Sequence, residues 1–246
     1  MTIPLPKWID VETISTCNRV CPTCLRNSHP DKKEISSWFR KQYLDIKLIE
    51  QILQQANEIG FNGNVRLSHF NEPTMDERLP AIAQLVKDYG YKAYINTNGD
   101  YITEELAKKL DDVFEEIIIT LYMGEPIKSQ RAKWLVTLFS KSKIQIITQS
   151  DHIPSHYSPA FDVKGLADQY RENPCHEPEM RIIINHRRQY LLCCEDVIGN
   201  FGLPKFPDVG LSDFWYGEYH QEIMKKLQKD AGGRHWHSYC ESCPKS

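Results

Sequence analysis

Apolar and polar positions alternate in two rhythms along the first 150 residues. Some stretches have a period of two or form β-branched runs, which is typical of strands, and others repeat apolar residues every three or four positions, which is typical of helices. The expected strands are residues 8–14, 64–70, 92–96, 117–121 and 143–149. The expected helices are residues 44–59, residues 76–89, a segment capped by Thr103, and residues 127–139. This alternation predicts a parallel α/β sheet or partial barrel, with the active site at the C-terminal strand ends.

The pattern changes after residue 150. Residues 151–173 are rich in His, Pro, Ser and Asp, and predict an irregular connector. Residues 180–194 predict a β-hairpin around a polar turn, and residues 211–230 predict one helix capped by Ser212. We therefore expect two parts: a partial barrel over residues 1–150, and a small extension over residues 151–246.

Composition and charge exclude several classes of partner. The chain of 246 residues has a net charge of −3, which gives no basic excess for nucleic acid, and it has no run of about 18 apolar residues to cross a membrane. Its first residues do not resemble a signal peptide. Eight cysteines without an export signal predict metal-bound thiolates in a reducing compartment. We expect a cytoplasmic monomer that binds a small molecule.

Three cysteines follow the first expected strand with the spacing C-x3-C-x2-C: Cys17, Cys21 and Cys24. Structural zinc takes four protein ligands, and iron–sulfur clusters are normally held by four cysteines. A group of three leaves one iron without a protein ligand, and a small molecule can bind there. The spacing resembles the signature of the radical S-adenosylmethionine (SAM) enzymes, in which the methionine end of SAM chelates the open iron.

Three later motifs match this superfamily in the same order, each at the end of an expected strand. Asn-Glu-Pro stands where the superfamily usually has Gly-Gly-Glu-Pro, whose acid binds the SAM ammonium group. Thr-Asn-Gly follows the third strand, and a Thr and a Tyr lie at the end of the fourth. Taken alone, the first two are ordinary turn signals. Because the motifs follow the cysteine triplet in the order found in the superfamily, they reinforce one another. The resemblance implies that the residues in contact with SAM are Asn71, Glu72, Asn98, Thr120 and Tyr122.

Two positions depart from the superfamily pattern. Asn71 replaces a glycine, so the backbone there need not approach SAM in the usual way. Thr23 stands where an aromatic residue usually precedes the third cysteine, so a ring that contacts adenine must come from elsewhere. Neither position supplies a cluster thiolate, and the assignment of the triplet does not depend on them.

The other five cysteines lie in the last third of the chain. Cys240 and Cys243 form a C-x2-C pair, Cys175 precedes the expected hairpin, and Cys193 and Cys194 end it. Four thiolates from this group can enclose a second metal site. From spacing alone, that site is either a structural zinc or an auxiliary [4Fe–4S] cluster without an open iron.

The hairpin, the helix and these cysteines resemble the twitch domain, a shortened SPASM extension of radical SAM enzymes. The pattern is most similar to that of the twitch dehydrogenases of 2-deoxy-scyllo-inosamine, in which the hairpin ends with a cysteine followed, one residue later, by Glu-Asp. Cys193 is followed in this way by Glu195 and Asp196, so the resemblance makes Cys193 a ligand and leaves Cys194 spare. The implied auxiliary ligands are Cys175, Cys193, Cys240 and Cys243.

The resemblance implies two [4Fe–4S] clusters and SAM as cofactors. A reduced first cluster would cleave SAM to a 5′-deoxyadenosyl radical that abstracts hydrogen from a cyclitol, an aminocyclitol or a sugar. The auxiliary cluster would accept a second electron, which gives net dehydrogenation, and a flavodoxin or ferredoxin would be the electron donor. Candidate catalytic residues at the barrel mouth are Gln149, Asp151, Glu195 and Tyr122.

Two other function classes stay open. Many SPASM proteins modify ribosomally made peptides, so a peptide-modifying radical SAM enzyme is the main alternative. Such enzymes commonly carry an N-terminal peptide-recognition domain, for which a first strand that begins at Trp8 leaves no room. A metal-binding scaffold without activity is disfavoured by the ordered SAM motifs.

Overall fold

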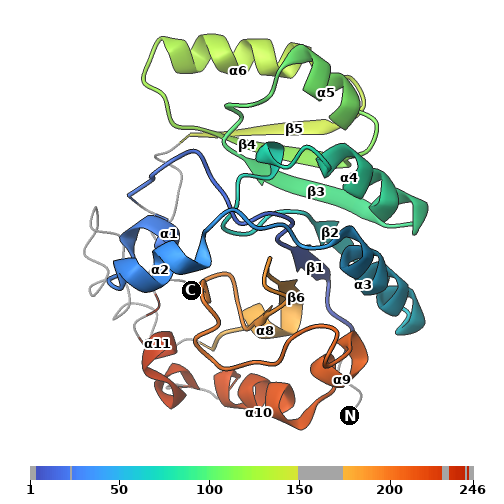
Figure 1. Ribbon diagram of the computed structural model, residues 1–246, viewed down its shortest axis with the longest axis vertical. Coiled ribbons are helices and arrows are strands. Elements are labelled where there is room, and N and C mark those ends of the chain that lie inside the picture. The colour runs from blue at the N-terminus through green and yellow to red at the C-terminus, as the bar shows by residue number, and fades with distance from the viewer. Residues whose placement is uncertain (1–3, 23, 149–173, 229–232, 242, 244–246) are drawn as a thin grey trace.

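The computed structural model of the chain describes residues 4–22, 24–148, 174–228, 233–241 and 243. These residues form a seven-stranded sheet in the order β5-β4-β3-β2-β1-β6-β7 (Figure 1). Neighbouring strands are parallel except β6 and β7, which are antiparallel. The strands are β1 (Trp8–Val11), β2 (Asn64–Arg66), β3 (Lys92–Thr97), β4 (Glu116–Leu121), β5 (Lys143–Thr148), β6 (Arg181–Ile184) and β7 (Tyr190–Leu191). The expected α/β fold with a mostly parallel sheet is confirmed.

Four helices alternate with the first five strands and pack on the sheet through one large hydrophobic core. They are α3 (Ile46–Glu58), α4 (Leu79–Asp88), α5 (Glu104–Leu110) and α6 (Ile127–Thr137). The side chain of Asp45 caps α3 by accepting from the amide of Lys47, and Thr103 caps α5 by accepting from the amide of Leu106, as expected. The apolar face of α3, which begins at Ile49, is buried.

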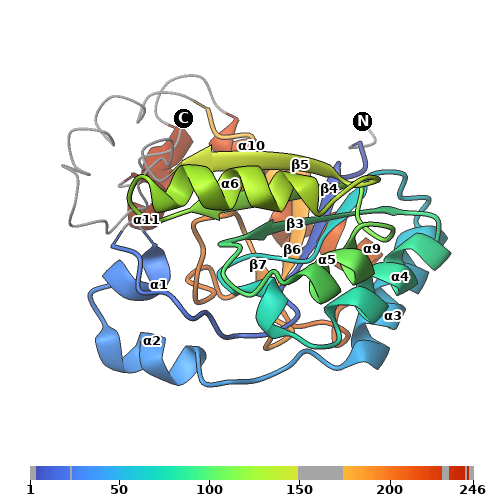
Figure 2. The same cartoon turned by 90° about the horizontal axis from the view of Figure 1, so that it is seen from above.

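Shorter helices surround the two ends of the chain. Helices α1 and α2 follow the first cysteine loop and lie on the other side of the molecule from α3 and α4 (Figures 1 and 2). The short elements are α1 (Leu25–Ser28), α2 (Lys32–Trp38), η1 (Pro73–Met75), α8 (Glu177–Met180), α9 (Leu211–Trp215), α10 (Glu218–Leu227), η3 (Gly233–Trp236) and α11 (Ser238–Glu241). No helix among the described residues is long and apolar enough to span a membrane.

The C-terminal helix differs from its prediction. Two helices, α9 and α10, replace the single helix expected over residues 211–230, and they are separated at Gly217. A Cβ atom at Gly217 would lie 2.4 Å from the carbonyl oxygen of Asp213, so only glycine fits this break. The expected cap was also wrong, because the N-cap of α9 is Gly210 and not Ser212.

The hairpin predicted over residues 180–194 forms, and it extends the main sheet. Strand β6 pairs in parallel with β1, with Ile9 opposite Ile182, while β7 returns antiparallel to β6. Strand β1 therefore lies between β2 and β6, inside the sheet. The expected second strand is shorter than predicted, because the hydroxyl of Ser68 accepts the amide of Asn96 in place of a backbone carbonyl, and the chain then turns away.

Candidate active site

The three cysteines of the first loop face one cavity at the C-terminal ends of the parallel strands. The cavity has a volume of about 690 Å³ and is open to solvent. The amide of Cys24 donates to the carbonyl oxygen of Cys21 at 3.2 Å, which makes the turn that leads into α1. Burial raises the pKa of the Cys24 thiol to about 12, and it also raises the pKa values of Cys17 and Cys21. A metal that binds here must therefore displace protons from these thiols.

All five residues predicted to contact SAM line the same cavity as the triplet. Their elements explain why: strands β2, β3 and β4 end at one edge of the sheet, where the loop after β1 also lies. The full lining is Cys17, Arg19, Cys21, Cys24, His69, Phe70, Asn71, Glu72, Asn96, Thr97, Asn98, Thr120 and Tyr122. Sequence reasoning missed Arg19 and Phe70. Phe70 is an aromatic residue directly before the Asn-Glu-Pro motif, and it lines the cavity.

The loop after β3 holds the cysteine loop in place. The side-chain amide of Asn98 donates to the Asn18 side-chain oxygen at 2.7 Å and lies 4.0 Å from the sulfur of Cys17. The guanidinium of Arg19 donates two hydrogen bonds to the carboxylate of Asp100, at 2.7 and 2.6 Å. A paired, planar contact of this kind fixes orientation as well as distance. The motif that resembles a SAM contact therefore also positions the cysteines.

Tyr122, directly after β4, also contacts the triplet. Its hydroxyl is hydrogen-bonded to the thiol of Cys21, and the guanidinium of Arg19 lies 5.2 Å from the centre of its ring. Burial raises the pKa of Tyr122, so its hydroxyl keeps its proton. A neutral Tyr122 can donate to Cys21 or to a ligand, but it is a poor base.

Glu72 is a buried carboxylate with four protein donors. Its Oε1 accepts from the amide of Thr74 at 3.0 Å and from the hydroxyls of Thr74 and Thr97 at 2.5 and 2.6 Å. Its Oε2 accepts only from the amide of Asn98, at 2.7 Å. Burial raises the pKa of Glu72, and these donors oppose that shift. Because a carboxylate oxygen has two lone pairs, Oε2 keeps one acceptor position, and Glu72 lines the cavity.

Two polar side chains beside Glu72 carry unpaired atoms. The side-chain oxygen of Asn71 accepts the amide of His69 at 2.8 Å, but its Nδ2 is buried without a partner. The Nε2 of His69 is also buried without a partner, and burial lowers the pKa of His69. An unpaired buried polar atom costs about 1–3 kcal/mol, so such atoms cluster where ligands bind.

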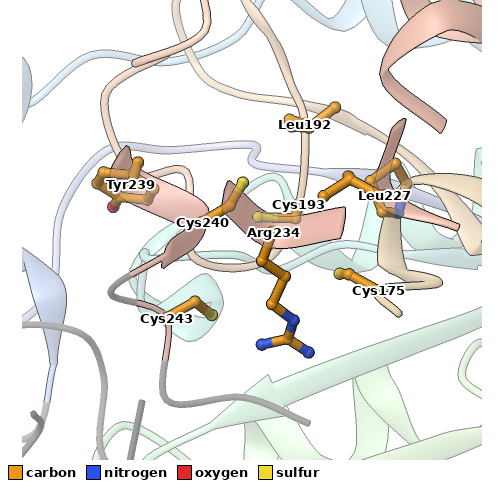
Figure 3. Close-up of a pocket in the computed structure, with 9 residues that line it drawn as sticks. Cys175, Leu192, Cys193, Leu227, Arg234, Tyr239, Cys240 and Cys243 are labelled. Carbon is orange, nitrogen blue, oxygen red and sulfur yellow. The ribbon is translucent and has the colours of Figure 1, made fainter. Parts of the chain in front are cut away.

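The four cysteines expected to hold an auxiliary cluster line a second cavity of about 330 Å³ (Figure 3). Cys194 is not among the described residues that line it. Figure 3 shows that the side chain of Arg234 extends toward the space between Cys175 and Cys243. Apolar or aromatic side chains complete most of the lining: Pro178, Leu192, Leu227 and Tyr239.

These cysteines come from separate segments, and one backbone contact joins two of the segments while two others form local turns. The amide of Cys175 donates to the carbonyl oxygen of Leu227 at 3.0 Å, and that of Cys243 donates to Cys240 at 3.2 Å. The amide of Asp196 donates to the carbonyl oxygen of Cys193 at 3.1 Å. The pair Cys240–Cys243 thus sits at the end of α11, opposite the hairpin.

This donor set fits an iron–sulfur cluster better than a hard cation, because all four side chains are thiols. Burial raises the pKa of Cys240 to about 12 and that of Cys193 well above its ordinary value. None of the eight cysteines, all of which are described, forms a disulfide. No three His, Cys, Asp or Glu side chains within the described ranges lie close enough to ligate a single metal ion.

A buried pair of side chains, Glu12 and His186, joins the segment after β1 to the turn of the hairpin. Glu12, directly after β1, accepts the amide of Phe70 on Oε1 at 3.1 Å and the Nδ1 of His186 on Oε2 at 2.5 Å. The other ring nitrogen of His186 lies 2.8 Å from the carbonyl oxygen of Trp38. Both ring nitrogens of His186 thus lie within hydrogen-bonding distance of an oxygen atom. Burial alone would raise the pKa of Glu12, but His186 lowers it below its ordinary value.

A second hydrophobic core lies beside this ion pair. Leu25, which follows Cys24, packs with Ile35 and Phe39 of the α2 region and with Val197 and Ile198, which follow the hairpin. The loop that carries the first cysteines and the loop that follows Cys193 therefore share one small core.

The four residues proposed from sequence for catalysis have different positions. Tyr122 lines the first cavity, whereas Glu195 is buried near the second, where its backbone carbonyl accepts the hydroxyl of Tyr239 at 2.5 Å. Gln149 and Asp151 lie outside the described residues.

Comparisons with curated proteins match part of the chain, and no protein-family model matches it. The tungsten-containing aldehyde ferredoxin oxidoreductase cofactor-modifying protein of Pyrococcus furiosus is 25% identical over 112 residues, which are 46% of this chain and 29% of that protein. The Fe-coproporphyrin III synthase of Methanosarcina barkeri is 30% identical over 110 residues, which are 37% of this chain and 28% of that protein. The chain thus matches less than a third of the length of either relative.

Solved structures match nearly the whole chain. BtrN in complex with AdoMet and 2-DOIA has a TM-score of 0.80 over 99% of this chain and 95% of BtrN, at 22% identity. SuiB of Streptococcus suis bound to precursor peptide SuiA scores 0.65 over 98% and 75%, at 14% identity. Native anSMEcpe with bound AdoMet scores 0.62 over 98% and 89%, at 13% identity. All three are radical SAM enzymes, so the resemblance expected from the sequence is confirmed at the level of the fold.

Proposed function

We propose that this chain, which has the fold of the radical SAM enzymes, binds SAM at a [4Fe–4S] cluster held by Cys17, Cys21 and Cys24 and dehydrogenates a small polyhydroxylated molecule. One observation carries the proposal: the three cysteines and the five residues that resemble SAM contacts all line one cavity. The fold similarity to BtrN, whose complex contains AdoMet and 2-DOIA, supports a cyclitol, an aminocyclitol or a sugar as substrate.

The residues around the first cavity have separate tasks in this proposal. The free acceptor position on Oε2 of Glu72 receives the ammonium group of SAM, and the unpaired Nδ2 of Asn71 donates to its carboxylate. Thr120 and Tyr122 contact the ribose, and Phe70 lies against the adenine. When bound, the cluster and SAM supply a 5′-deoxyadenosyl radical that abstracts hydrogen from the substrate. The protein excludes water and orients the substrate carbon toward that radical.

In this proposal, an auxiliary cluster in the second cavity would accept the second electron, which the substrate radical loses. Cys175, Cys193, Cys240 and Cys243 would hold an auxiliary [4Fe–4S] cluster with no open iron, in a twitch-type extension. Glu195 follows Cys193 closely and is buried, so we assign it a contact with a substrate hydroxyl. The division into a barrel over residues 1–150 and an extension over residues 151–246 is part of this proposal, although β6 and β1 share one sheet.

A second candidate is a peptide-modifying radical SAM enzyme. It is favoured by the fold similarity to SuiB bound to its precursor peptide and to anSMEcpe bound to a peptide. Both similarities are weaker than that to BtrN, with TM-scores of 0.65 and 0.62 against 0.80.

The test is anaerobic reconstitution with iron and sulfide, followed by incubation with SAM, dithionite and a panel of aminocyclitols. We expect about eight irons per chain, 5′-deoxyadenosine, and a ketone formed in proportion to it. The variant Cys193→Ala should lose about four irons per chain. The matched control Cys194→Ala should keep the full iron content. Failure of the wild-type chain to form 5′-deoxyadenosine would refute the radical assignment. Turnover of a peptide, with no ketone from any cyclitol, would favour the second candidate.

A further inference from the structure

A buried arginine lies among the four C-terminal cysteines. Arg234 is 2% exposed and lines the second cavity, and Figure 3 shows that its side chain extends toward the space between Cys175 and Cys243. Among the described residues that line this cavity, the cysteines aside, Arg234 is the only one with a charged side chain. A guanidinium group keeps its positive charge in proteins. The lining of the cavity therefore contributes a fixed positive charge.

The packing of η3 places Arg234 at the wall of the cavity. A Cβ atom at Gly233 would lie 2.8 Å from the carbonyl oxygen of Lys226 and 3.0 Å from that of Leu227, so η3 begins directly against the C-terminal end of α10. Helix α11, which carries Cys240, also contacts η3. The backbone at Arg234 is therefore enclosed between two helices that both supply lining residues.

Two acidic residues near the cysteines are engaged with other groups. The carboxylate of Asp196 accepts the amides of Leu192 and Asn200, at 3.0 and 2.7 Å. A carboxylate oxygen of Glu177 lies 3.0 Å from the Nε of Arg181. Each of these carboxylates thus has donors of its own outside the cavity lining, whereas the side chain of Arg234 extends among the thiols.

A second donor accompanies Arg234. The indole Nε1 of Trp236 is buried beside the thiol of Cys240 and has no oxygen or nitrogen partner in the part of the chain that the structure describes. Burial raises the pKa values of Cys175 and Cys240, and the charge of Arg234 opposes this shift at both thiols. Arg234 is therefore close enough to act electrostatically on ligands from two separate segments.

A positive charge and hydrogen-bond donors beside an iron–sulfur cluster raise its reduction potential. Reduction adds an electron to a group that four thiolates already make negative, so a nearby cation stabilises the reduced form more than the oxidised form. The effect is stronger in apolar surroundings, where little water screens the charge. A guanidinium group is also costly to bury unless negative charge lies near it, and a cluster held by four thiolates provides that charge.

We propose that Arg234 raises the reduction potential of the auxiliary cluster, and that Trp236 adds a smaller contribution in the same direction. The inference rests on the proposed function, since it requires a cluster held by the four C-terminal cysteines. In that reaction the substrate radical loses one electron and its hydroxyl proton to become a ketone, and the electron passes to the auxiliary cluster. Arg234 favours this transfer because its charge stabilises the reduced acceptor.

The test measures the potential of the auxiliary cluster alone. Replacement of Cys17, Cys21 and Cys24 by Ala leaves the C-terminal cysteines to hold a cluster, and about four irons per chain are then expected. In this background an anaerobic redox titration is followed by electron paramagnetic resonance. Arg234→Gln should lower the potential by about 59 mV, which corresponds to an equilibrium constant for uptake of the electron that is about tenfold smaller.

Three further variants in the same background separate charge from packing. Arg234→Lys keeps the charge, so the equilibrium constant should change by no more than about twofold. Trp236→Phe removes a donor but keeps a ring, and the expected decrease is about threefold. Lys225→Gln is the matched control, because it removes the same charge at an exposed position of α10, where water and salt screen it, and it should leave the potential unchanged.

Three results would overturn the proposal. These are an unchanged potential in Arg234→Gln, an equal shift in Arg234→Gln and either Arg234→Lys or Lys225→Gln, or loss of the iron from Arg234→Gln, because the arginine would then only maintain the metal site. Binding of zinc in place of iron by the chain without the first three cysteines is a different failure. That result would refute the auxiliary cluster of the proposed function, and the inference about Arg234 would fall with it.

Discussion

The first cysteine group comes from eight consecutive residues, whereas the second takes Cys175, Cys193 and the pair Cys240–Cys243 from three distant segments. The first cavity is open and is lined by side chains that carry hydrogen-bonding groups, such as Glu72 and Asn98. Apolar side chains dominate the second, together with one arginine. A site with spare donors and acceptors suits a cofactor that brings its own polar groups. A site in which the protein supplies all the ligands suits a metal cluster that binds no further molecule.

The largest expected effect separates the two cysteine groups. Replacement of Cys17, Cys21 and Cys24 by Ala should abolish 5′-deoxyadenosine formation, because no cluster remains to reduce SAM. Replacement of the four C-terminal cysteines by Ala should remove about half of the iron and abolish the ketone product, while cleavage of SAM continues. Iron analysis and chromatography of both products measure the difference. Loss of SAM cleavage in both variants would mean that the two regions are not separate in function.

The next effect concerns the acid of the first cavity. Glu72→Gln replaces an acceptor by an amide group that faces donors from Thr74, Thr97 and Asn98. We expect the affinity for SAM to fall about 100-fold, which corresponds to about 2.7 kcal/mol. Equilibrium binding of SAM to the reconstituted protein measures this. Glu77→Gln, at an exposed position five residues later, is the matched control and should leave the affinity unchanged.

The connection between the two regions can be broken at Glu12. Glu12→Gln leaves the buried His186 without its carboxylate partner, and we expect the free energy of unfolding to fall by about 3 kcal/mol. Urea denaturation of the chain without clusters measures the loss. The exposed Glu50→Gln variant should change stability by less than about 0.5 kcal/mol. A similar small effect for Glu12→Gln would show that the ion pair does not hold the two regions together.

The smallest effect is a dependence of stability on pH. The pKa of Glu12 in the folded chain lies below the ordinary value of 4.5, because His186 outweighs the effect of burial. The unfolded chain therefore takes up this proton at a higher pH than the folded chain, so stability falls as the pH drops below about 4.5. Denaturation curves between pH 3 and 6 should show a shallower fall for Glu12→Gln than for wild type. Identical slopes would exclude Glu12 as the group responsible.

Short-range patterns predicted much of the fold. The periodicities located β1 to β5 and α3 to α6 to within a few positions, but they did not predict α1 and α2, and Thr103 caps α5 as expected. Periodicity did not reveal the break between α9 and α10, because apolar spacing continues across Gly217, where the backbone adopts a conformation that leaves no room for a Cβ atom. The parallel pairing of β6 with β1 was not predicted either. A hairpin pattern specifies only the antiparallel partner of a strand, which here is β7.

In the candidate site, too, local sequence patterns predicted some features and not others. The spacing of the triplet and the motifs at the strand ends indicated residues that the fold brings to one cavity. Glu12 and His186 were not predicted, because they are 174 residues apart and each is an ordinary polar residue in its own segment. The convergence of Cys175, Cys193, Cys240 and Cys243 was predicted only from resemblance, since no local pattern relates three separate segments.

The place of β1 between β2 and β6 has a consequence for how the protein is made. Trp8 lies opposite Arg181, so β1 leaves the ribosome long before β6 and lacks one of its two neighbours until residues 181–184 have been synthesised. During that interval the edge of β1 is an unpaired template for other strands, and contacts of such long range form slowly. The cysteine loop that follows β1 is complete throughout this period. Insertion of the proposed cluster and closure of the sheet can therefore occur as separate events, and chains that stop before residue 181 should aggregate.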